Sequence, residues 1–555
     1  MKIHKNIGKA ISQQAAVFPH RDALILPYRN WYGKRIYKHY SYQYLDQLTE
    51  DLAKGILSAG LQPKDRCIIM LKPSLAFFTL TFALFKSGVI PVFIDPGMGF
   101  RKLKACLIRS RPVAFIGGNK AHLIRLIFGC PFFPKKLTLT VNSYFPSCLS
   151  LSSLKKIGQK VSGMTLPNIQ GEDTAAILFT SGSTGKPKGA EYLHRHFMSQ
   201  IESLKTNLAI RDGERDLCTF PLFALFAPAL GMTAIVPDMN FIRPASVKLK
   251  AITDPLSQFQ ITNLFGSPAL IKTLCRQMDL KKKLPYLKRV VTAGAPVSPK
   301  ILAQFKNHLE DQCPIFTPYG ATEALPIAIT QSTEILEETY NATRTGAGIC
   351  VGLPVPEIVV MIMKITDSPI KELLETDLLD TEEIGEIIVS GPQVTERYLN
   401  DKTSTDDNKI FDRIGSRLFH RMGDCGYLDH HGRLWFCGRK SQRVMVDEHT
   451  TLHTIACESV FNEHPLVNRT ALVGLGSRPR QKPVLCIESE HRLTFAQKET
   501  ILSAYRQKSS SIPKVKSIQS FLFYQGTFPV DIRHNAKIFR ENLTAWAKTK
   551  KTSMS

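Results

Sequence analysis

The chain has 555 residues, of which 43% are hydrophobic and 21% are charged, and its formal net charge is +25. A chain of this length is expected to form more than one domain, because single hydrophobic cores stop growing near about 250 to 300 residues. The composition excludes a mainly disordered chain. The positive charge favours anionic partners such as nucleotides, nucleic acid or acidic lipid headgroups.

The basic residues are spread along the chain rather than gathered in one module. Two short clusters, at 34–38 and 281–289, lack the interleaved aromatic residues that a nucleic-acid reader would carry, and we interpret them as solvated faces. We therefore expect no specific nucleic-acid partner, while a weak association with a membrane surface stays open.

The spacing of the cysteines and the residues at the N-terminus indicate the cellular compartment in which the protein works. The twelve cysteines form no C-x-x-C pair, so neither a zinc site nor a disulfide framework is predicted. The first residues precede no apolar signal segment, and the apolar run at 75–85 is too short to span a bilayer. We expect a cytoplasmic protein.

The first half of the chain alternates helical and strand patterns. Residues 1 to about 25 have the spacing of an amphipathic helix that ends near Pro19, and Ser41 is a suitable N-cap for a second helix. Buried strands are predicted at 66–71 and 89–95, with a helix at 74–87 between them. This alternation predicts an α/β fold with a parallel, doubly wound sheet.

A loop rich in glycine and hydroxyl groups follows another apolar strand, at Ala175–Phe179. Its sequence is Thr-Ser-Gly-Ser-Thr-Gly-Lys-Pro-Lys-Gly at 180–189. Glycines let backbone N–H groups approach an anion, the hydroxyls add donors, and Lys186 and Lys188 add positive charge. A Walker loop requires Ser or Thr directly after its lysine, but Pro187 stands there. We predict a triphosphate-binding loop of another kind.

Further strands end in turns of small residues near 218, 265 and 294, and ligands of open α/β sheets lie beyond the carboxyl ends of strands. These turns are candidates for one shared crevice. The loop at Tyr319–Glu323 brings an aromatic ring, a hydroxyl and a carboxylate together. After a predicted hairpin at 426–437, charge breaks the apolar pattern, and we place a domain boundary between residues 438 and 439.

Five segments in this order resemble the AMP-forming adenylating superfamily, which includes acyl-CoA synthetases, adenylation domains and luciferases. They are FTSGSTGKPKG at 179–189, YGATE at 319–323, RMGD at 421–424, GRKSQR at 438–443 and the late Lys537. Within that superfamily, the segments at 221–232, 317–326 and 528–540 look most like the β-lactone synthetases of bacterial olefin biosynthesis.

The resemblance implies a large N-terminal domain of layered sheets (1–438) and a small mobile α+β lid (439–555). It implies conversion of ATP and a carboxylate to acyl-AMP and pyrophosphate with Mg²⁺. By matching motifs, Lys537, Thr184 and Glu323 would be catalytic, and Thr184 and Glu323 would hold the metal. The cofactor-binding residues would be Thr180, Ser181, Gly182, Ser183, Gly185, Lys186 and Lys188 around the phosphates, with Tyr319, Gly320, Thr322, Asp424 and Arg439 around the nucleoside and α-phosphate.

Other residues keep two interpretations. His194 and His196 could line the ligand site or be structural, and Phe220, Phe223, Leu225 and Phe226 could wall an acyl pocket or be plain core. Coenzyme A ligases of this superfamily usually carry a glycine turn after the hinge, whereas residues 446–453 contain none. We therefore expect a long-chain β-hydroxy acid to close into a β-lactone. A fatty acyl-CoA or acyl-AMP ligase is the alternative, and a non-enzymatic binding protein on a decayed scaffold is a third.

Overall fold

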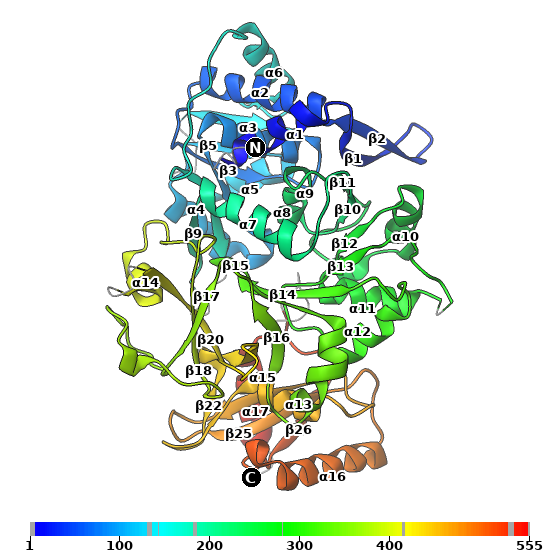
Figure 1. Ribbon diagram of the computed structural model, residues 1–555, viewed down its shortest axis with the longest axis vertical. Coiled ribbons are helices and arrows are strands. Elements are labelled where there is room, and N and C mark those ends of the chain that lie inside the picture. Colours follow the sequence, from blue (N-terminus) through cyan, green and yellow to red (C-terminus); the bar gives the residue numbers. More distant parts are fainter. Residues whose placement is uncertain are drawn as a thin grey trace.

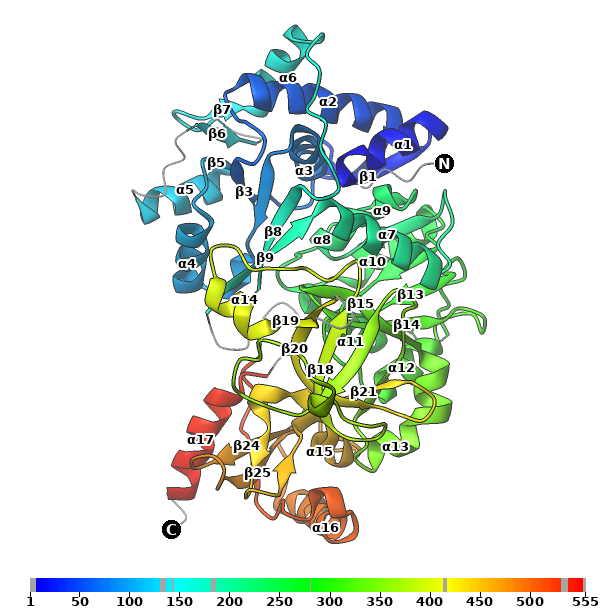
Figure 2. The ribbon, with the colours of Figure 1, turned by 60° about the vertical axis from the view of Figure 1, so that its left-hand side comes forward.

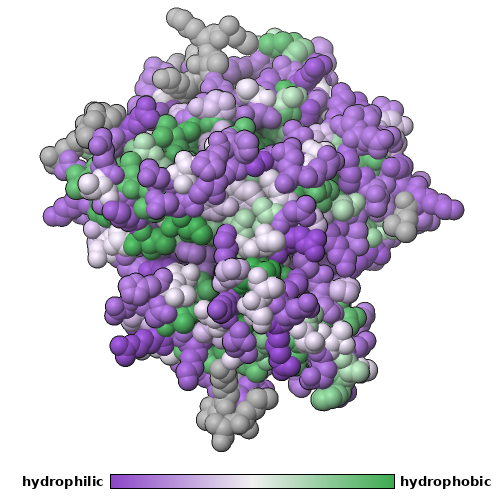
Figure 3. Space-filling view, turned by 60° about the horizontal axis from the view of Figure 1, so that its bottom comes forward, coloured by the Kyte–Doolittle hydropathy of each residue, from purple (hydrophilic) through white to green (hydrophobic). Residues whose placement is uncertain are grey.

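The computed structural model describes residues 6–129, 136–141, 144–180, 186–279, 281–412, 417–530 and 538–552. Figure 1 shows two α/β layers in the upper part of the molecule and a smaller C-terminal part below them. No helix in these ranges is long and apolar enough to cross a membrane. The face drawn in Figure 3 is largely hydrophilic, with separate hydrophobic patches.

A seven-stranded sheet forms the first layer of the described chain, in the order β7-β6-β5-β3-β4-β8-β9. The strands from β7 to β8 are parallel, and β9 is antiparallel to β8. The strands are β3 (Arg66–Met70), β4 (Ile90–Phe93), β5 (Ala114–Gly117), β6 (Leu137–Thr140), β7 (Leu149–Ser150), β8 (Thr174–Thr180) and β9 (Lys188–Leu193).

Helices cover both faces of this sheet, as Figure 2 shows. In β3, Cys67 and Ile69 pack with α2 and α3, while Ile68 packs with α4 and α5 on the opposite face. Burial on both faces explains the continuous apolar strands. The helices are α2 (Tyr42–Ser58), α3 (Leu75–Ser87), α4 (Phe100–Ser110), α5 (Asn119–Phe128) and α6 (Leu151–Lys160).

A second sheet has fourteen strands within the described residues. Its path is β17-β18-β20-β21-β16-β15-β14-β13-β12-β10-β11-β1-β2, with β19 on β20. The bounds are β1 (Asp22–Arg29), β2 (Arg35–Ser41), β10 (Arg215–Cys218), β11 (Thr233–Ile235), β12 (Asn263–Phe265), β13 (Arg289–Val291), β14 (Ile315–Ala321), β15 (Ala324–Gln331), β16 (Ile349–Pro354), β17 (Val359–Met363), β18 (Gly385–Ser390), β19 (Lys409–Asp412), β20 (Arg417–Leu428) and β21 (Leu434–Arg439).

The direction of pairing changes at β14. From β1 through β11, β10, β12 and β13 to β14 the neighbours are parallel, and from β14 to β21 they are antiparallel. Helices connect and flank these strands: α1 (Ala10–Val17), α7 (His194–Asn207), α8 (Pro221–Ala224), α9 (Phe226–Ala229), α10 (Leu249–Gln258), α11 (Pro268–Gln277), α12 (Pro299–Lys306), α13 (Tyr340–Arg344) and α14 (Lys402–Asn408).

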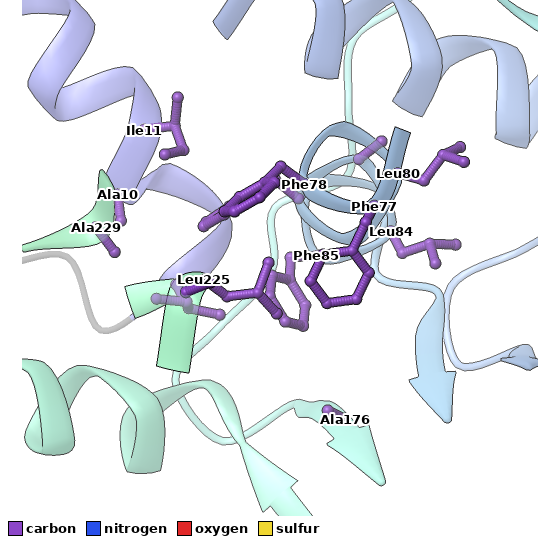
Figure 4. Packing of buried hydrophobic residues seen from close by; sticks show 14 of the residues in the cluster. Ala10, Ile11, Phe77, Phe78, Leu80, Leu84, Phe85, Ala176, Leu225 and Ala229 are labelled. Atoms are coloured by element: carbon purple, nitrogen blue, oxygen red, sulfur yellow. The ribbon is translucent and has the colours of Figure 1, made fainter. Parts of the chain in front are cut away.

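The largest apolar cluster lies where the two layers meet. Figure 4 shows Phe78 and Phe85 of α3 beside Ile11 of α1 and Ala229 of α9. Helix α3 is buried on nearly every side, which explains its apolar run at 75–85 and the absence of a polar stripe. The core therefore joins the N-terminal helix, the first sheet and the region of α8 and α9.

The C-terminal part has its own apolar clusters, formed by residues between 444 and 547. Its elements are β22 (Val444–Met445), β23 (Thr451–Leu452), α15 (Thr454–Phe461), β24 (Arg469–Leu475), β25 (Lys482–Glu488), α16 (Phe495–Ser511), β26 (Phe521–Phe523) and α17 (Arg540–Thr552). The large sheet ends with β21 at Arg439, next to the predicted boundary between 438 and 439, and that boundary stays a prediction.

Most of the expected elements are present. The parallel sheet, the strands near 66–71 and 89–95 and the helix at 74–87 are confirmed, and the Ser41 side chain caps α2 by accepting the N–H of Tyr44. Helix α1 ends at Val17, close to the predicted end near Pro19, whereas residues 22–25 of the predicted helical segment belong to β1. Residues 22–29 pair on both sides, with β2 and β11, and this long-range pairing overrides the local helical pattern.

Candidate active site

The segment at 319–323 forms a tight hairpin rather than the predicted loop. Tyr319 and Gly320 belong to β14, and Thr322 and Glu323 form a turn between Ala321 and Ala324, which are register partners. A Cβ on Gly320 would lie 2.6 Å from the backbone oxygen of Ala324. The close approach of the two strands therefore requires glycine at this position.

Tyr319 on β14, Asp424 on β20 and Arg439 on β21 meet on the large sheet, although β15 and β16 separate β14 from β21 in the strand order. The Tyr319 hydroxyl donates to Asp424 Oδ2 at 2.7 Å, and Arg439 Nη1 lies 2.9 Å from Asp424 Oδ1. Asp424 and Arg439 are register partners on β20 and β21. Burial raises the pKa of the Asp424 carboxyl, and the Arg439 guanidinium opposes that shift. The three residues proposed for the nucleoside are thus brought together.

Glu323 lies at the centre of a second buried cluster. The Tyr398 hydroxyl donates to Glu323 Oε1 at 2.8 Å. The ammonium groups of Lys188 and Lys409 lie 5.2 Å and 5.9 Å from the centre of the Tyr398 ring. Burial lowers the pKa of both lysines, that of Lys409 to about 7, while the negative charge of Glu323 acts in the opposite direction. Glu323 therefore lies near two lysines on the side of β9 and β19.

Backbone contacts fix the turn that carries Glu323. The Tyr192 hydroxyl donates to the backbone oxygen of Thr322, and Gln200 donates to that hydroxyl at 3.3 Å. The backbone N–H and the hydroxyl of Thr395 donate to the oxygen of Glu323 at 2.8 Å and 3.2 Å. The first sheet and the segment before α14 thus hold the turn from two sides.

The glycine-rich loop leaves and returns through paired strands. Thr180 ends β8 and is the register partner of Lys188, which begins β9 and is buried. Arg109 donates to the backbone oxygen of Pro187 at 3.0 Å and to Asp401. Lys186 is exposed. The remaining predicted residues of this group, Ser181, Gly182, Ser183, Thr184 and Gly185, lie outside the described residues, as does Lys537.

Several residues of these clusters were not found from the sequence. Tyr398, Lys409, Thr395 and Tyr192 hold Glu323 or its turn, yet Tyr398 is 75 residues from Glu323 along the chain. No periodicity or motif spacing links positions so far apart. The burial of Lys409 follows from the pairing of β19 with β20, which no local sequence pattern predicts.

The two histidines favour the structural interpretation. His196 Nδ1 accepts the backbone N–H of Leu193 at 3.1 Å, as an N-terminal cap of α7. His194 packs edge-on against Phe85, with ring centres 6.0 Å apart. Burial lowers the pKa of His194 to about 4 and that of His196 to about 3, so both rings are neutral at pH 7.

An apolar cavity of about 60 Å³ lies between the parallel half of the large sheet and the region of α7, α8 and α9. Phe223 and Phe226 line it, and the Phe223 ring stacks on Phe265 at 4.3 Å. Phe220 lies next to Phe223, and Leu225 belongs to the main core. Pro318 and Leu325 also line the cavity, which therefore adjoins the hairpin that carries Tyr319 and Glu323.

A magnesium ion fits the site as a phosphate-bound ion. Among the described residues, no group of three or more His, Cys, Asp or Glu side chains could hold a metal by itself. Mg²⁺ commonly uses one or two carboxylates, several waters and the substrate phosphates. Glu323 offers such a carboxylate at the edge of the loop-bearing sheet, so the donor set suits a magnesium–nucleotide complex.

The family model and the relatives reported below show that the chain is an AMP-forming, carboxylate-activating ligase. The chain belongs to the AMP-binding enzyme family, whose model matches residues 11–399.

Two proteins of known name match most of this chain. It is 43% identical over 512 residues to an olefin β-lactone synthetase of Xanthomonas campestris pv. campestris, covering 91% of this chain and 90% of that protein. It is 42% identical over 550 residues to an olefin β-lactone synthetase of Stenotrophomonas maltophilia, covering 98% of each.

Among solved structures, the chain is similar to O-succinylbenzoate coenzyme A synthetase from Bacillus subtilis in complex with ATP and magnesium ion. The TM-score is 0.73 at 18% identity, with 96% of this chain and 99% of that chain covered. The likeness extends over the large sheets and the C-terminal part, so the two chains share the whole fold.

Proposed function

We propose that this protein activates a long-chain β-hydroxy acid with ATP and closes it to a β-lactone. The observation that carries the proposal is the identity of 42–43% with two olefin β-lactone synthetases over nearly the whole chain. The cavity beside the Tyr319–Glu323 hairpin supports it, because apolar walls suit an alkyl chain.

In the first step, a carboxylate oxygen of the acid attacks the α-phosphorus of ATP, and the bond to the β-phosphate breaks to release pyrophosphate. Like charges about 4 Å apart repel by about 4 kcal/mol at an effective dielectric constant of about 20. Cations must therefore accompany the phosphates. Lys186, Lys188 and Lys537 would supply positive charge, and Thr184 and Glu323 would hold Mg²⁺, which would add further positive charge beside the phosphates.

The remaining loop residues would position the polyphosphate through N–H and hydroxyl groups. They are Thr180, Ser181, Gly182, Ser183 and Gly185. Tyr319 and Gly320 would flank the adenine, and Thr322 would contact the α-phosphate. Asp424 would accept the ribose hydroxyls, since each of its oxygens has one protein partner and a carboxylate accepts about four hydrogen bonds. Arg439 would keep that carboxylate ionised.

In the second step, the β-hydroxyl oxygen attacks the acyl carbonyl carbon, the carbon–oxygen bond to AMP breaks, and the hydroxyl proton passes to solvent. This step needs no channel for a second substrate. The segment after the hinge supports such a route, because residues 446–453 are compact. Val446 donates its N–H to Thr450 at 2.9 Å, and β22 pairs with β23.

The test is an incubation with ATP, Mg²⁺ and a 2-alkyl-3-hydroxy fatty acid, with and without coenzyme A, followed by mass spectrometry of the products. We expect β-lactone, AMP and pyrophosphate in both incubations. A thioester formed only with coenzyme A, and no lactone, would instead support an acyl-CoA ligase.

A Lys537→Ala variant tests the first step. We expect pyrophosphate release to fall by at least about 100-fold, because a cation between the two anions stabilises the transition state. The unfolding temperature should stay unchanged. Release at the wild-type rate would remove Lys537 from the mechanism.

A further inference from the structure

A row of polar residues crosses one face of the large sheet inside its apolar core. Asp216 on β10, Asn263 on β12 and Arg289 on β13 are register partners in sequence across the three strands. All three are buried and all three line the cavity, whose other lining residues are apolar. Their neighbours along the strands, such as Leu264, face the opposite, wholly apolar cluster. The cavity therefore has apolar walls and one polar end.

Two members of the row are engaged with each other and with a buried acid. Arg289 forms an ion pair with Glu214 and donates to Asn263 Oδ1, and its Nη2 donates to the backbone oxygen of Ala209 at 2.9 Å. Asn263 Nδ2 donates to Glu214 Oε2 at 3.0 Å. Arg289 and Asn263 are thus held by protein groups and need nothing from the cavity.

Asp216 is different. Among the described residues, the thiol of Cys218 is the side chain that donates to its carboxylate, at 3.1 Å. A thiol is a weak donor. A buried carboxylate with so little support needs water, and the adjoining cavity is where water can reach it. Burial raises the pKa of this carboxyl to about 6, so it is mainly ionised at pH 7.

The polar row lies at a defined depth below the reaction site. Arg289, Val291 and Ala293 all line the cavity, at alternate positions of β13 and the residues that follow it. The strand from Arg289 to Val291 spans about 7 Å, and Ala293 lies two residues beyond its end. Val291 is the register partner of Phe316, which precedes Pro318 by two residues, so the polar row lies more than about 7 Å below the end of the cavity that adjoins the hairpin.

We propose that Asp216 sets the length of the alkyl chain that the cavity accepts. Chains that end before the polar row are bound, whereas a chain that reaches Asp216 displaces its water and leaves the carboxylate unsolvated, which is unfavourable. The place of the acid in this cavity rests on the proposed function. Asp216 is in this view a specificity-determining residue that takes no part in the chemistry.

The test compares wild type with Asp216→Asn, which keeps the size and removes the charge, and with Asp216→Ala, which also opens the cavity. A matched control is Asp254→Asn, on α10 at the other face of the sheet and half exposed. The substrates are 3-hydroxy fatty acids that differ by two carbons. The readout is kcat/KM for pyrophosphate release.

We expect the wild-type profile to fall steeply beyond one chain length. In both Asp216 variants the first rejected acid should gain about tenfold in kcat/KM, a usual effect of fit in an apolar pocket, while shorter acids stay within about twofold. The control should keep the wild-type profile. An equal loss for all acids, or an unchanged profile in both variants, overturns the proposal.

Binding of the same acids, followed by the rise in unfolding temperature, tests Asp216 without catalysis. Should wild type release no pyrophosphate with any acid, the proposed function fails. The chain-length dependence of binding in wild type and variants then still decides whether Asp216 limits the chain.

Discussion

At the scale of single residues, the carboxylate of Glu323, which we propose as a ligand of Mg²⁺, is held in place by a neighbouring hydroxyl group. Tyr398 supplies one hydrogen bond, and the amines of Lys188 and Lys409 lie near the same ring without a direct salt bridge to Glu323 in the described structure. Within the described ranges, no hydrogen bond to the second carboxylate oxygen of Glu323 is found, so that oxygen could accept a ligand. Loss of a neighbour that orients a metal ligand typically lowers metal affinity or activity by about 10- to 100-fold.

Replacing Tyr398 by Phe removes the 2.8 Å hydrogen bond to Glu323 and little else. A hydrogen bond to a charged group contributes about 1.5–3 kcal/mol, so we expect kcat/KM for pyrophosphate release to fall by about 10- to 100-fold. The required Mg²⁺ concentration should also rise. Tyr340→Phe, which removes a hydrogen bond to Glu463 in the C-terminal part, is the matched control. Equal kinetics in the two variants would contradict the role of Tyr398.

The raised pKa of Asp216 has a consequence for stability. The Asp216 carboxyl holds its proton more tightly in the folded state than in the unfolded state. Its protonation therefore adds to the free energy of unfolding at low pH, and this contribution is lost as the pH rises through about 6. Between pH 5 and pH 7 the loss is about 1 kcal/mol. Asp216→Asn should therefore have a higher unfolding temperature relative to wild type at pH 7 than at pH 5. A difference that is constant with pH would show that Asp216 does not titrate near 6.

At the scale of elements, the β14–β15 hairpin connects the two halves of the site. Tyr319 on one side of it contacts Asp424, and Glu323 at its tip contacts Tyr398. The same hairpin contributes Pro318 and Leu325 to the cavity. A small displacement of this hairpin would therefore change nucleotide contacts and acyl contacts together.

Gly320→Ala would produce such a displacement. The new Cβ would lie 2.6 Å from the Ala324 oxygen and 2.8 Å from Leu325 Cδ1. We expect a loss of about 1–3 kcal/mol in stability from overpacking and a larger proportional loss of activity. The measurements are thermal unfolding and kcat/KM with ATP. Gly423→Ala is a useful contrast, since its Cβ would meet open space although its φ of +63° adds strain.

Helix α17 is attached to the C-terminal part by a buried ion pair. Arg540 donates to both oxygens of Glu458, at 2.5 Å and 2.9 Å, and its Nε donates to Gln442 at 3.0 Å. Glu458→Gln would leave the guanidinium partly unpaired, and we expect about 3–5 kcal/mol of destabilisation, seen as a lower unfolding temperature. Arg443→Gln, which removes an ion pair with the exposed Asp367, should cost less. A larger loss of stability in Arg443→Gln than in Glu458→Gln would show that the Arg540–Glu458 ion pair is not the main attachment of α17.

The same elements show what local pattern can predict. Continuous apolar runs gave the parallel strands, and glycine with hydroxyl groups marked the loop after β8, because both signals lie within a few consecutive residues. Arg289 was interpreted as part of a solvated basic cluster at 281–289, yet it is buried. Its environment is decided by pairing with β12 and by Glu214, and no local pattern carries that information. Tyr398 and Asp216 were missed for the same reason.

At the scale of the whole molecule, the motifs follow one another along the chain, whereas the residues that pack around them come from distant parts of the sequence. The order of five motifs was sufficient to predict the family and the two-part α/β fold. The packing of α3 against α1 and α9, and the polar end of the cavity, depend on how two sheets meet. Such contacts join segments that are far apart along the chain, such as α3 (Leu75–Ser87) and α9 (Phe226–Ala229), so they follow from the fold rather than from the sequence pattern.

The position of β1 has a consequence for synthesis. Residues 22–29 leave the ribosome early, but one of the two neighbours of this strand, β11, begins at Thr233. At about 5–20 residues per second, roughly 10–40 s pass before that neighbour is made. During this time β1 has β2 on one side and an open apolar edge on the other. The nascent chain thus carries a strand with an unpaired edge that could pair with another chain until β11 is made.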